Sequence, residues 1–329
     1  MYWRSVGLKA LLTFATAVWA AALPLASDAQ TYPAKPIHLL VGWSPGGGVD
    51  VTARILTDKL SAMLGQPIIV ENHPGAGGNI AGALAAKAAP DGYTILLGTN
   101  GELAINASLF KDPGFHPIND FSHVAMVVRV PIIMAAHPSV PATDVRSVIE
   151  YSKKQPSGLV VGSPGNGSLG HLIGELMRTT YGAKILHVPY KGAAPAITDL
   201  VGGQVQMVFS SMPAVLPHLR SGRLKAFAVT TDQRVDAVPD LPTVTEAGCP
   251  GLTAFNWYAV VGPAGMPPAV ITKLNEAFKQ VLSDPAIKVK LAEQGLEAWT
   301  MSPQEVRSYM QSEVTRWEKV VQASGTRID

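Results

Sequence analysis

Cysteine is nearly absent from this chain, because Cys249 is the only one among 329 residues. A single cysteine cannot form an intramolecular disulfide, so packing must stabilise the fold. In an oxidising compartment a lone thiol is best kept buried, and we interpret Cys249 as a small buried residue rather than a reactive group. The eight histidines are scattered without metal-ligand spacing. The sequence therefore predicts neither a disulfide framework nor a metal site.

Long apolar runs are absent except at the start of the chain. Arg4 and Lys9 precede an uncharged run over residues 10–27, and small residues flank a cut between Ala29 and Gln30. This pattern is typical of a secretory signal peptide. A proline and several alanines weaken the run as a membrane span, although an uncleaved anchor is the alternative. We therefore expect the leader to be removed and the rest of the chain to act in the periplasm.

An excess of charge of either sign is also lacking. Without Arg4, Lys9 and Asp28, the 26 basic and 24 acidic side chains of the chain become 24 and 23. This balance gives no reason to expect a nucleic-acid partner. The mature chain would have about three hundred residues, which is too many for one hydrophobic core of ordinary size. The length therefore predicts two domains.

From Pro36 onward, short β-branched or apolar runs alternate with amphipathic helical patterns. This alternation predicts an α/β fold with mostly parallel sheets flanked by helices. The first round has expected strands at 37–41, 67–70 and 93–98 and helices at 49–64 and 80–88. The second has strands at 132–136, 159–162, 185–188, 205–209 and 224–229 and helices at 144–154, 169–177 and 196–201. The two rounds predict two sheets.

The last part of the chain adds a strand at 257–261 and three helices. The final helix begins with Ser302-Pro303-Gln304-Glu305, a capping box with proline at the first helical position. Its apolar face has to be buried against another element, and we place it on the first sheet. We therefore expect a signal peptide at 1–29, a first domain at 30–131 and 251–329, and a second domain at 132–250. The chain would cross between the domains near Pro131 and Gly251.

Four glycine-rich turns, at 44–48, 74–79, 163–168 and 189–192, each separate an expected strand from an expected helix. In open α/β sheets, ligands bind outside the carboxyl ends of the strands, where such turns lie. Glycine lets the backbone approach a ligand closely, and the first N–H groups of a helix carry a partial positive charge. An anion, most simply a carboxylate, fits such a place. Two turns fall in each half, so the sequence predicts a shared cleft.

Nucleotide and enzyme motifs are missing. No turn matches a P-loop or a dinucleotide fingerprint, and we expect no cofactor. The Gly-x-Ser-x-Gly elbow of hydrolases is absent as well. Ser168 and His171 lie three residues apart on an expected helix, so a periplasmic hydrolase or isomerase that uses them is the alternative to a protein without catalytic residues.

Several segments in a fixed order resemble one family. They are Ser44-Pro45-Gly46-Gly47-Gly48-Val49-Asp50, Val70-Glu71-Asn72-His73-Pro74-Gly75-Ala76-Gly77-Gly78-Asn79, Pro90-Asp91-Gly92-Tyr93-Thr94, Gly165-Asn166-Gly167-Ser168 with His171, and Val188-Pro189-Tyr190-Lys191-Gly192. With them the chain, over residues 32–329, resembles the periplasmic solute-binding proteins of the tripartite tricarboxylate transporter family, also called Bug proteins.

The resemblance implies a two-domain periplasmic-binding-protein fold, a Venus flytrap with two crossover strands, that closes on a carboxylic acid or amino acid without making or breaking a bond. The ligand would be held largely by backbone N–H groups. On matching positions and their neighbours, the candidate ligand-binding residues are Trp43, Ser44, Gly46, Gly47, Gly48, Asp50, Gly77, Asn100, Ser163, Gly165, Asn166, Ser168, His171, Tyr190, Lys191, Gly192 and Ser210.

Two departures from the family pattern bear on the ligand. Trp43-Ser44 stands where relatives often have phenylalanine and proline, and Ser210-Ser211 stands where many have aspartate. Hydroxyls in place of a carboxylate remove a partner for an ammonium group, so we expect a di- or tricarboxylate or an aromatic carboxylate. The implied partners are membrane subunits of the transporter, or a sensor protein as the alternative, and we expect a monomer.

Overall fold

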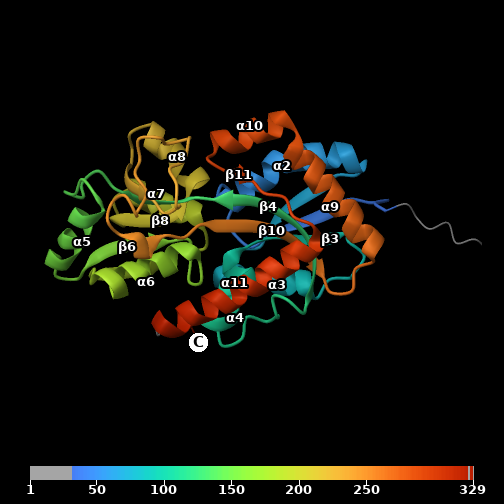
Figure 1. The fold of residues 1–329 in the computed structure, drawn as a ribbon, viewed down its shortest axis with the longest axis horizontal. Coiled ribbons are helices and arrows are strands. Elements are labelled where there is room, and N and C mark those ends of the chain that lie inside the picture. Colours follow the sequence, from blue (N-terminus) through green and yellow to red (C-terminus); the bar gives the residue numbers. More distant parts are fainter. Residues whose placement is uncertain (1–31, 325–326, 329) are drawn as a thin grey trace, which may run out of the picture. The chain divides into compact units, whose positions relative to one another are not determined.

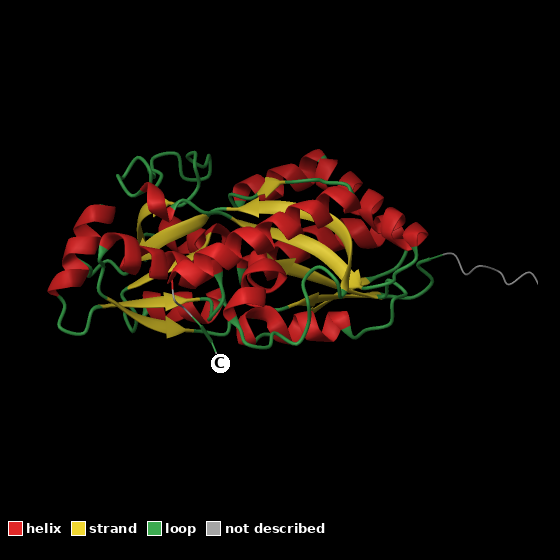
Figure 2. Cartoon of the chain, turned by 60° about the horizontal axis from the view of Figure 1, so that its bottom comes forward, coloured by secondary structure: helices red, strands yellow, loops and turns green. Residues whose placement is uncertain are grey.

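Two β-sheets organise the protein in the computed structural model, which describes residues 32–324 and 327–328. Figures 1 and 2 show the strands of each sheet covered by helices. The α/β class with two helix-flanked sheets is therefore confirmed. The expected signal peptide lies outside the described residues. Among the helices that the structure describes, none is long and apolar enough to span a bilayer.

The first sheet has the strand order β11-β4-β10-β3-β1-β2. Its strands are β1 Ile37–Val41, β2 Ile68–Asn72, β3 Thr94–Thr99, β4 Phe121–Val130, β10 Asn256–Pro263 and β11 Glu297–Ala298. Helices α2 Gly48–Leu64, α9 Pro268–Ser283 and α10 Pro285–Glu293 cover one face, and α3 Asn79–Ala86, α4 Asn106–Leu109 and α11 Pro303–Ser324 cover the other (Figure 1). Two short helices, η1 Ala76–Gly78 and the π-helix η2 Gly101–Ile105, lie at the ends of loops and strands.

The second sheet has the order β7-β6-β8-β5-β9. Its strands are β5 Ile132–Ala136, β6 Leu159–Ser163, β7 Ile185–Pro189, β8 Met207–Ser211 and β9 Lys225–Val229. The helices around it are α5 Val145–Lys154, α6 Leu169–Tyr181, α7 Ala193–Val201 and α8 Met212–Arg220, and a short helix, η3 Pro250–Leu252, precedes β10.

Most strands of each sheet point in the same direction, but both sheets contain antiparallel as well as parallel pairs of neighbouring strands. In the first sheet, β2, β1 and β3 pair in parallel, and β10 runs antiparallel between β3 and β4. In the second, β7, β6 and β8 pair in parallel, and β5 runs antiparallel between β8 and β9. Each sheet thus consists of a parallel βαβ part that ends on an inserted antiparallel strand, which the alternating pattern of the sequence did not show.

The chain passes between the sheets twice. The first crossing is Pro131, between β4 and β5, and the return runs from β9 to β10. Thr230, fully buried, ties the two crossings together. Its N–H donates to Ile132 O over 3.0 Å, its hydroxyl donates to Ala254 O over 2.6 Å, and Ala254 N–H donates back to Thr230 O over 2.9 Å.

Two elements that the sequence analysis did not predict are important for this arrangement. Strand β4 contains an unbroken apolar run at 124–128, which is typical of a strand but was not assigned to one from the sequence. Helix α8 contains Pro213 and Pro217. Proline is tolerated near a helix start, where N–H groups lack intrahelical partners anyway, and Pro217 costs α8 one hydrogen bond.

The predicted capping box of α11 is confirmed, because Ser302 N–H donates to Glu305 Oε2 over 2.8 Å.

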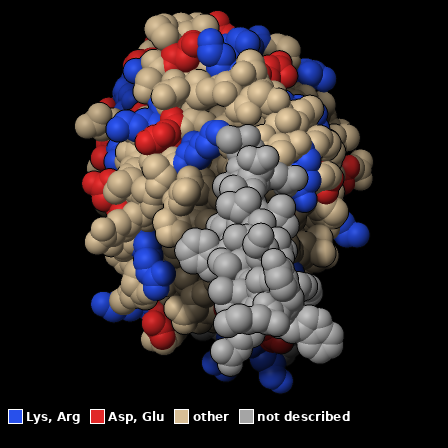
Figure 3. Space-filling model, turned by 90° about the vertical axis from the view of Figure 1, so that its right-hand side faces the viewer, with Lys and Arg blue, Asp and Glu red and all other residues tan. Residues whose placement is uncertain are grey.

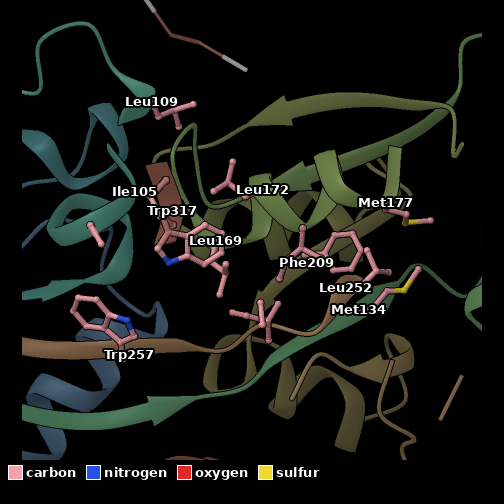
Figure 4. Packing of buried hydrophobic residues seen from close by; sticks show 14 of the residues in the cluster. Ile105, Leu109, Met134, Leu169, Leu172, Met177, Phe209, Leu252, Trp257 and Trp317 are labelled. Atoms are coloured by element: carbon pink, nitrogen blue, oxygen red, sulfur yellow. The ribbon is translucent and has the colours of Figure 1, made fainter. Parts of the chain in front are cut away.

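One apolar cluster extends through both sheets. Figure 4 shows Trp257 and Trp317 in the same cluster as Leu169, Leu172 and Phe209. Helix α11 packs its apolar face against β4, η2 and α4. Cys249 is buried as expected, and burial raises the pKa of its thiol.

Candidate functional site

Four helices begin around one cavity of about 430 Å³, a volume that includes space open to solvent. Gly48, Leu169 and Ala193, the first residues of α2, α6 and α7, line it, as does Ser211, the residue before α8. Because these helices come from both sheets, the cavity is built by the two parts of the chain together. The partial positive charge of four helix N-termini is directed to one place.

Three of these helix starts, those of α2, α7 and α8, have no side-chain cap. The residues before α2 and α7 are Gly47 and Gly192, and neither offers a capping side chain. In α6, Ser168 Oγ accepts only from His171 N–H, over 3.3 Å. In α8, the first N–H donates to Pro131 O and the second residue is proline. Free N–H groups therefore come mainly from α2, α6 and α7, and an acceptor in the cavity would satisfy them.

None of the described residues that line the cavity carries a charge. The lining residues are Trp43, Gly47, Gly48, Val49, Thr99, Ile132, Pro164, Ser168, Leu169, Gly170, Ala193, Phe209, Ser210, Ser211, Asn256 and Tyr258. Burial raises the pKa of Tyr258 well above its usual range, so its hydroxyl stays neutral. The cavity therefore offers donors and apolar walls but no carboxylate that would repel an anion.

Ser210, near the end of β8, lines this cavity. Its side chain is completely buried, and its Oγ has no hydrogen-bond partner among the described residues. Asn100, beside the lining residue Thr99, is also completely buried, with both side-chain polar atoms unpartnered there. Leaving such groups unsatisfied costs about 1–3 kcal/mol each, so a ligand or water that bonds to them is stabilising.

The glycine-rich turns also contact one another. A side chain at Gly77 would overlap the carbonyl oxygen of Asn166, and one at Gly192 would overlap Ser44 Oγ. At Gly48 an added Cβ would lie 2.5 Å from Ser211 Oγ. Each pair joins a turn of one sheet to a turn or strand end of the other. Several of these glycines therefore allow backbone to approach backbone across the cleft.

The predicted residues divide between two cavities. Trp43, Gly47, Gly48, Ser168 and Ser210 line the cavity described above. A second cavity of about 510 Å³, also partly open to solvent, is lined by Gly77, Gly165, Asn166, Tyr190 and Lys191 among others, and by Trp43, which is common to both. Ser44, Gly46, Asp50, Asn100, Ser163, His171 and Gly192 line neither.

Asp50 shapes the first glycine turn. Its carboxylate accepts hydrogen bonds from Gly46 N–H and Arg54 Nε, both over 2.9 Å, and from Asn72 Nδ2 over 3.1 Å. Burial alone would raise the pKa of Asp50, but these hydrogen bonds outweigh it and lower the pKa. The carboxylate is therefore fully engaged away from the cavity.

Two neutral histidines support the turn at 163–168. His171 Nδ1 accepts from Gly167 N–H over 3.4 Å, and His187 Nε2 lies 2.7 Å from Ser163 Oγ. The rings stack with centroids 4.4 Å apart. Burial lowers the pKa of both imidazoles, that of His187 to about 4. His187 was not predicted, and its place just before the Pro189-Tyr190 turn is the signal that could have found it.

The Ser168 and His171 pair does not form a nucleophile and base. Ser168 Oγ donates to Gly165 O over 2.7 Å and accepts from the backbone N–H of His171. The His171 ring instead bonds to Gly167. The geometry gives the hydrolase alternative no support.

Among residues 32–324 and 327–328, no three His, Cys, Asp or Glu side chains are grouped to hold a metal.

The lining residues Thr99, Asn256 and Tyr258 were not predicted. They meet because β10 inserts beside β3, and Tyr258 pairs with Thr99 across these strands. The strand around Trp257 was expected from the sequence, but no local pattern shows which strand it joins. Outside the cavities, the face drawn in Figure 3 has Lys and Arg side chains interspersed with Asp and Glu.

The cavity between the two sheets, with helix N-termini around it, has the form of a ligand-binding cleft. The chain belongs to the tripartite tricarboxylate transporter receptor family, whose model matches residues 52–326. BugT of Bordetella pertussis is 37% identical over 308 residues, which cover 93% of this chain and 94% of BugT.

Two solved structures are similar over nearly the whole chain. The R. palustris protein Rpa4515, solved with adipate, is 37% identical with a TM-score of 0.87, over 90% of this chain and 99% of that one. MatC from Rhodopseudomonas palustris, solved with bound malate, is 32% identical with a TM-score of 0.85, over 88% of this chain and 100% of that one. The suspected family is confirmed, and with it the solute-binding function.

Proposed function

We propose that this receptor captures a small dicarboxylate between two lobes and delivers it to membrane subunits of a tripartite tricarboxylate transporter. The observation that carries the proposal is the convergence of four helix N-termini on a cavity whose lining, in the described part of the chain, contains no charged side chain. Such a site binds an anion through backbone N–H groups and helix dipoles. The adipate and malate in two similar structures support a carboxylate as the ligand.

An amino acid fits the cavity poorly. An ammonium group needs an acceptor, preferably a carboxylate, and β8 ends here in Ser210 and Ser211. Their hydroxyls, with Thr99 and Tyr258, suit a second carboxylate or a hydroxyl of the ligand better than a cation. Trp43 and Phe209 supply apolar wall for the carbon chain.

The lobes of this proposal are residues 30–131 with 251–329, and residues 132–250. Rigid-body rotation about the crossings near Pro131 and Gly251 would open and close the cleft. The ligand favours the closed form because only there do helix starts from both lobes reach it together. The protein would act as a monomer in the periplasm, after cleavage near Ala29 and Gln30.

Calorimetric titration of ligand-free protein tests the proposal. The panel is adipate, malate, citrate and benzoate, with glutamine as the amino-acid comparison. We expect one dicarboxylate to bind with one ligand per chain and glutamine to give no heat. Absence of binding by every carboxylate would contradict the proposal, and binding of glutamine alone would overturn the ligand class.

A further inference from the structure

Glu102 is a buried carboxyl group next to the cavity. Its side chain is completely buried in η2. No Lys or Arg of the described residues lies within ion-pair distance of it. A buried ionised carboxylate without a cation is costly, so its charge depends strongly on its surroundings.

Glu102 is bonded directly to the cavity wall. Its Oε1 accepts from Thr99 N–H over 3.0 Å, and its Oε2 lies 2.5 Å from Thr99 Oγ1. Thr99 lines the cavity. Gly101 N–H also donates to Thr99 Oγ1, over 3.1 Å. The Thr99 hydroxyl is thus hydrogen-bonded to the buried acid on one side and lines the cavity on the other.

The protonation state of Glu102 decides what Thr99 presents to the cavity. When Glu102 is ionised, the hydroxyl hydrogen of Thr99 points to Oε2, and only a lone pair is left for the cavity. When Glu102 is protonated, it donates to Thr99 Oγ1, and the Thr99 hydrogen is free to turn to the cavity. An anion there is repelled by the first arrangement and hydrogen-bonded by the second.

Few other ionisable groups surround Glu102. The elements η1, β3, α3 and α4, which pack against η2, contain none. Tyr258 lies on β10, and its pKa is raised by burial and by the charge of Glu102. On α11 the buried ionisable group is Glu313, which accepts from Trp257 and Trp317 over 2.9 and 3.1 Å. Across the cleft, His171 lies behind the Gly167 turn that faces Gly101.

We propose that Glu102 takes up a proton from solvent when a carboxylate enters the cavity, and that Thr99 then donates its hydroxyl hydrogen to the ligand. The inference rests on the proposed function. One ligand anion and one proton enter together, so the loss of the Glu102 charge offsets one of the two negative charges of a dicarboxylate. Glu102 is therefore a positioning residue: it orients the Thr99 hydroxyl, and Thr99 contacts the ligand.

The ionisation of Glu102 supports this coupling near neutral pH. Burial raises the pKa of Glu102 to about 7, although hydrogen bonds from Thr99 oppose the rise. The charge of a bound anion raises it further. Burial lowers the pKa values of His171 and His187, that of His187 to about 4, so both imidazoles lose their protons more readily than a free imidazole.

Titration calorimetry in buffers of different ionisation enthalpy measures the proton directly. The probe is adipate or malate, whichever binds the wild-type protein more tightly, at pH 7.5. We expect uptake of most of one proton per ligand. We also expect the Kd to rise about thirtyfold between pH 6 and pH 8.5, because a group with a pKa of about 7 must be reprotonated for binding.

Glu102→Gln is the matched variant, since its amide donates to Thr99 Oγ1 as the protonated acid would. It should bind without proton uptake and with the same Kd at both pH values. Glu313→Gln, which changes a buried acid away from the cavity, should keep the wild-type pH dependence. The buffer series on wild-type protein needs no variant, so poor folding of Glu102→Gln would not prevent the test.

The outcomes separate this inference from the proposed function. A ligand that binds with no proton uptake and a constant Kd overturns the coupling and leaves carboxylate capture intact. No binding by either probe, with none from the wider panel, overturns both. Equal pH dependence in Glu102→Gln and wild type would also refute the role of Glu102.

Discussion

At the scale of single residues, Ser210 places a neutral hydroxyl at the end of β8. It is buried, unpartnered among the described residues, and part of a cavity wall without any acid. A single oxygen there can accept a ligand donor or donate to a ligand oxygen. Aspartate at the same place would be acceptor only and negatively charged.

Replacement of Ser210 by aspartate should abolish carboxylate binding. The added charge would face the ligand charge in a site that excludes water, where repulsion is weakly screened. We expect the Kd for adipate or malate to rise at least about a hundredfold, close to 3 kcal/mol. Calorimetric titration measures it, and Ser221→Asp, at an exposed position after α8, is the control that should bind as wild type. Retained affinity in Ser210→Asp would place the anion elsewhere.

At the scale of elements, the glycine turns bring two sheets into backbone contact. Gly77 has a φ of 63°, and a side chain there would overlap Asn166 O in the opposite turn. Gly222, with a φ of 68°, has no atom within 4 Å of an added Cβ. The two positions share a positive φ, but Gly77 is buried against the opposite turn and Gly222 is exposed.

This difference predicts unequal effects of Gly77→Ala and Gly222→Ala. Both should lower the free energy of unfolding by about 1 kcal/mol, because alanine is strained at positive φ. Only Gly77→Ala should also weaken ligand binding, by at least about tenfold, since the closed contact with Asn166 is blocked. Urea unfolding and titration of both variants provide the comparison. Equal affinities in the two variants would show that closure does not bring these turns together.

The sequence predicted most elements but only part of their arrangement. Local periodicity located the helix from Gly48 and the strand β5 almost to the residue, since each has an unbroken pattern. Strand β4 was missed although its residues 124–128 form an unbroken apolar run. The glycine turns were predicted from local spacing, whereas Thr99, Asn256 and Tyr258 enter the site through the register of β10 with β3. Such long-range pairing leaves no mark in a single sequence.

For the whole molecule, Thr230 connects the two passages of the chain between the sheets. Its hydroxyl donates to Ala254 O over 2.6 Å, and its N–H donates to Ile132 O. Both carbonyls belong to the segments that enter and leave the second sheet. Motion of one sheet relative to the other must therefore act on this buried hydrogen-bonded link.

Thr230→Val keeps the volume and removes the hydroxyl. The carbonyl of Ala254 would keep no hydroxyl donor, so the free energy of unfolding should fall by about 1–3 kcal/mol. Thr57→Val, whose hydroxyl bonds to Arg54 O within α2 over 3.4 Å, should lose less. Urea denaturation of both variants measures the difference, and equal losses would contradict a special role for the link.

The amides at the starts of α2, α6 and α7 exist whatever side chains those residues carry. Point mutations can remove a lysine or an arginine, but they cannot delete a peptide N–H except by introducing proline. Recognition of the charged head of a metabolite is thereby inherited with the fold itself. The side chains around these amides can therefore change during evolution. The same fold can then bind different acids while the amides continue to bind the carboxylate that those acids share.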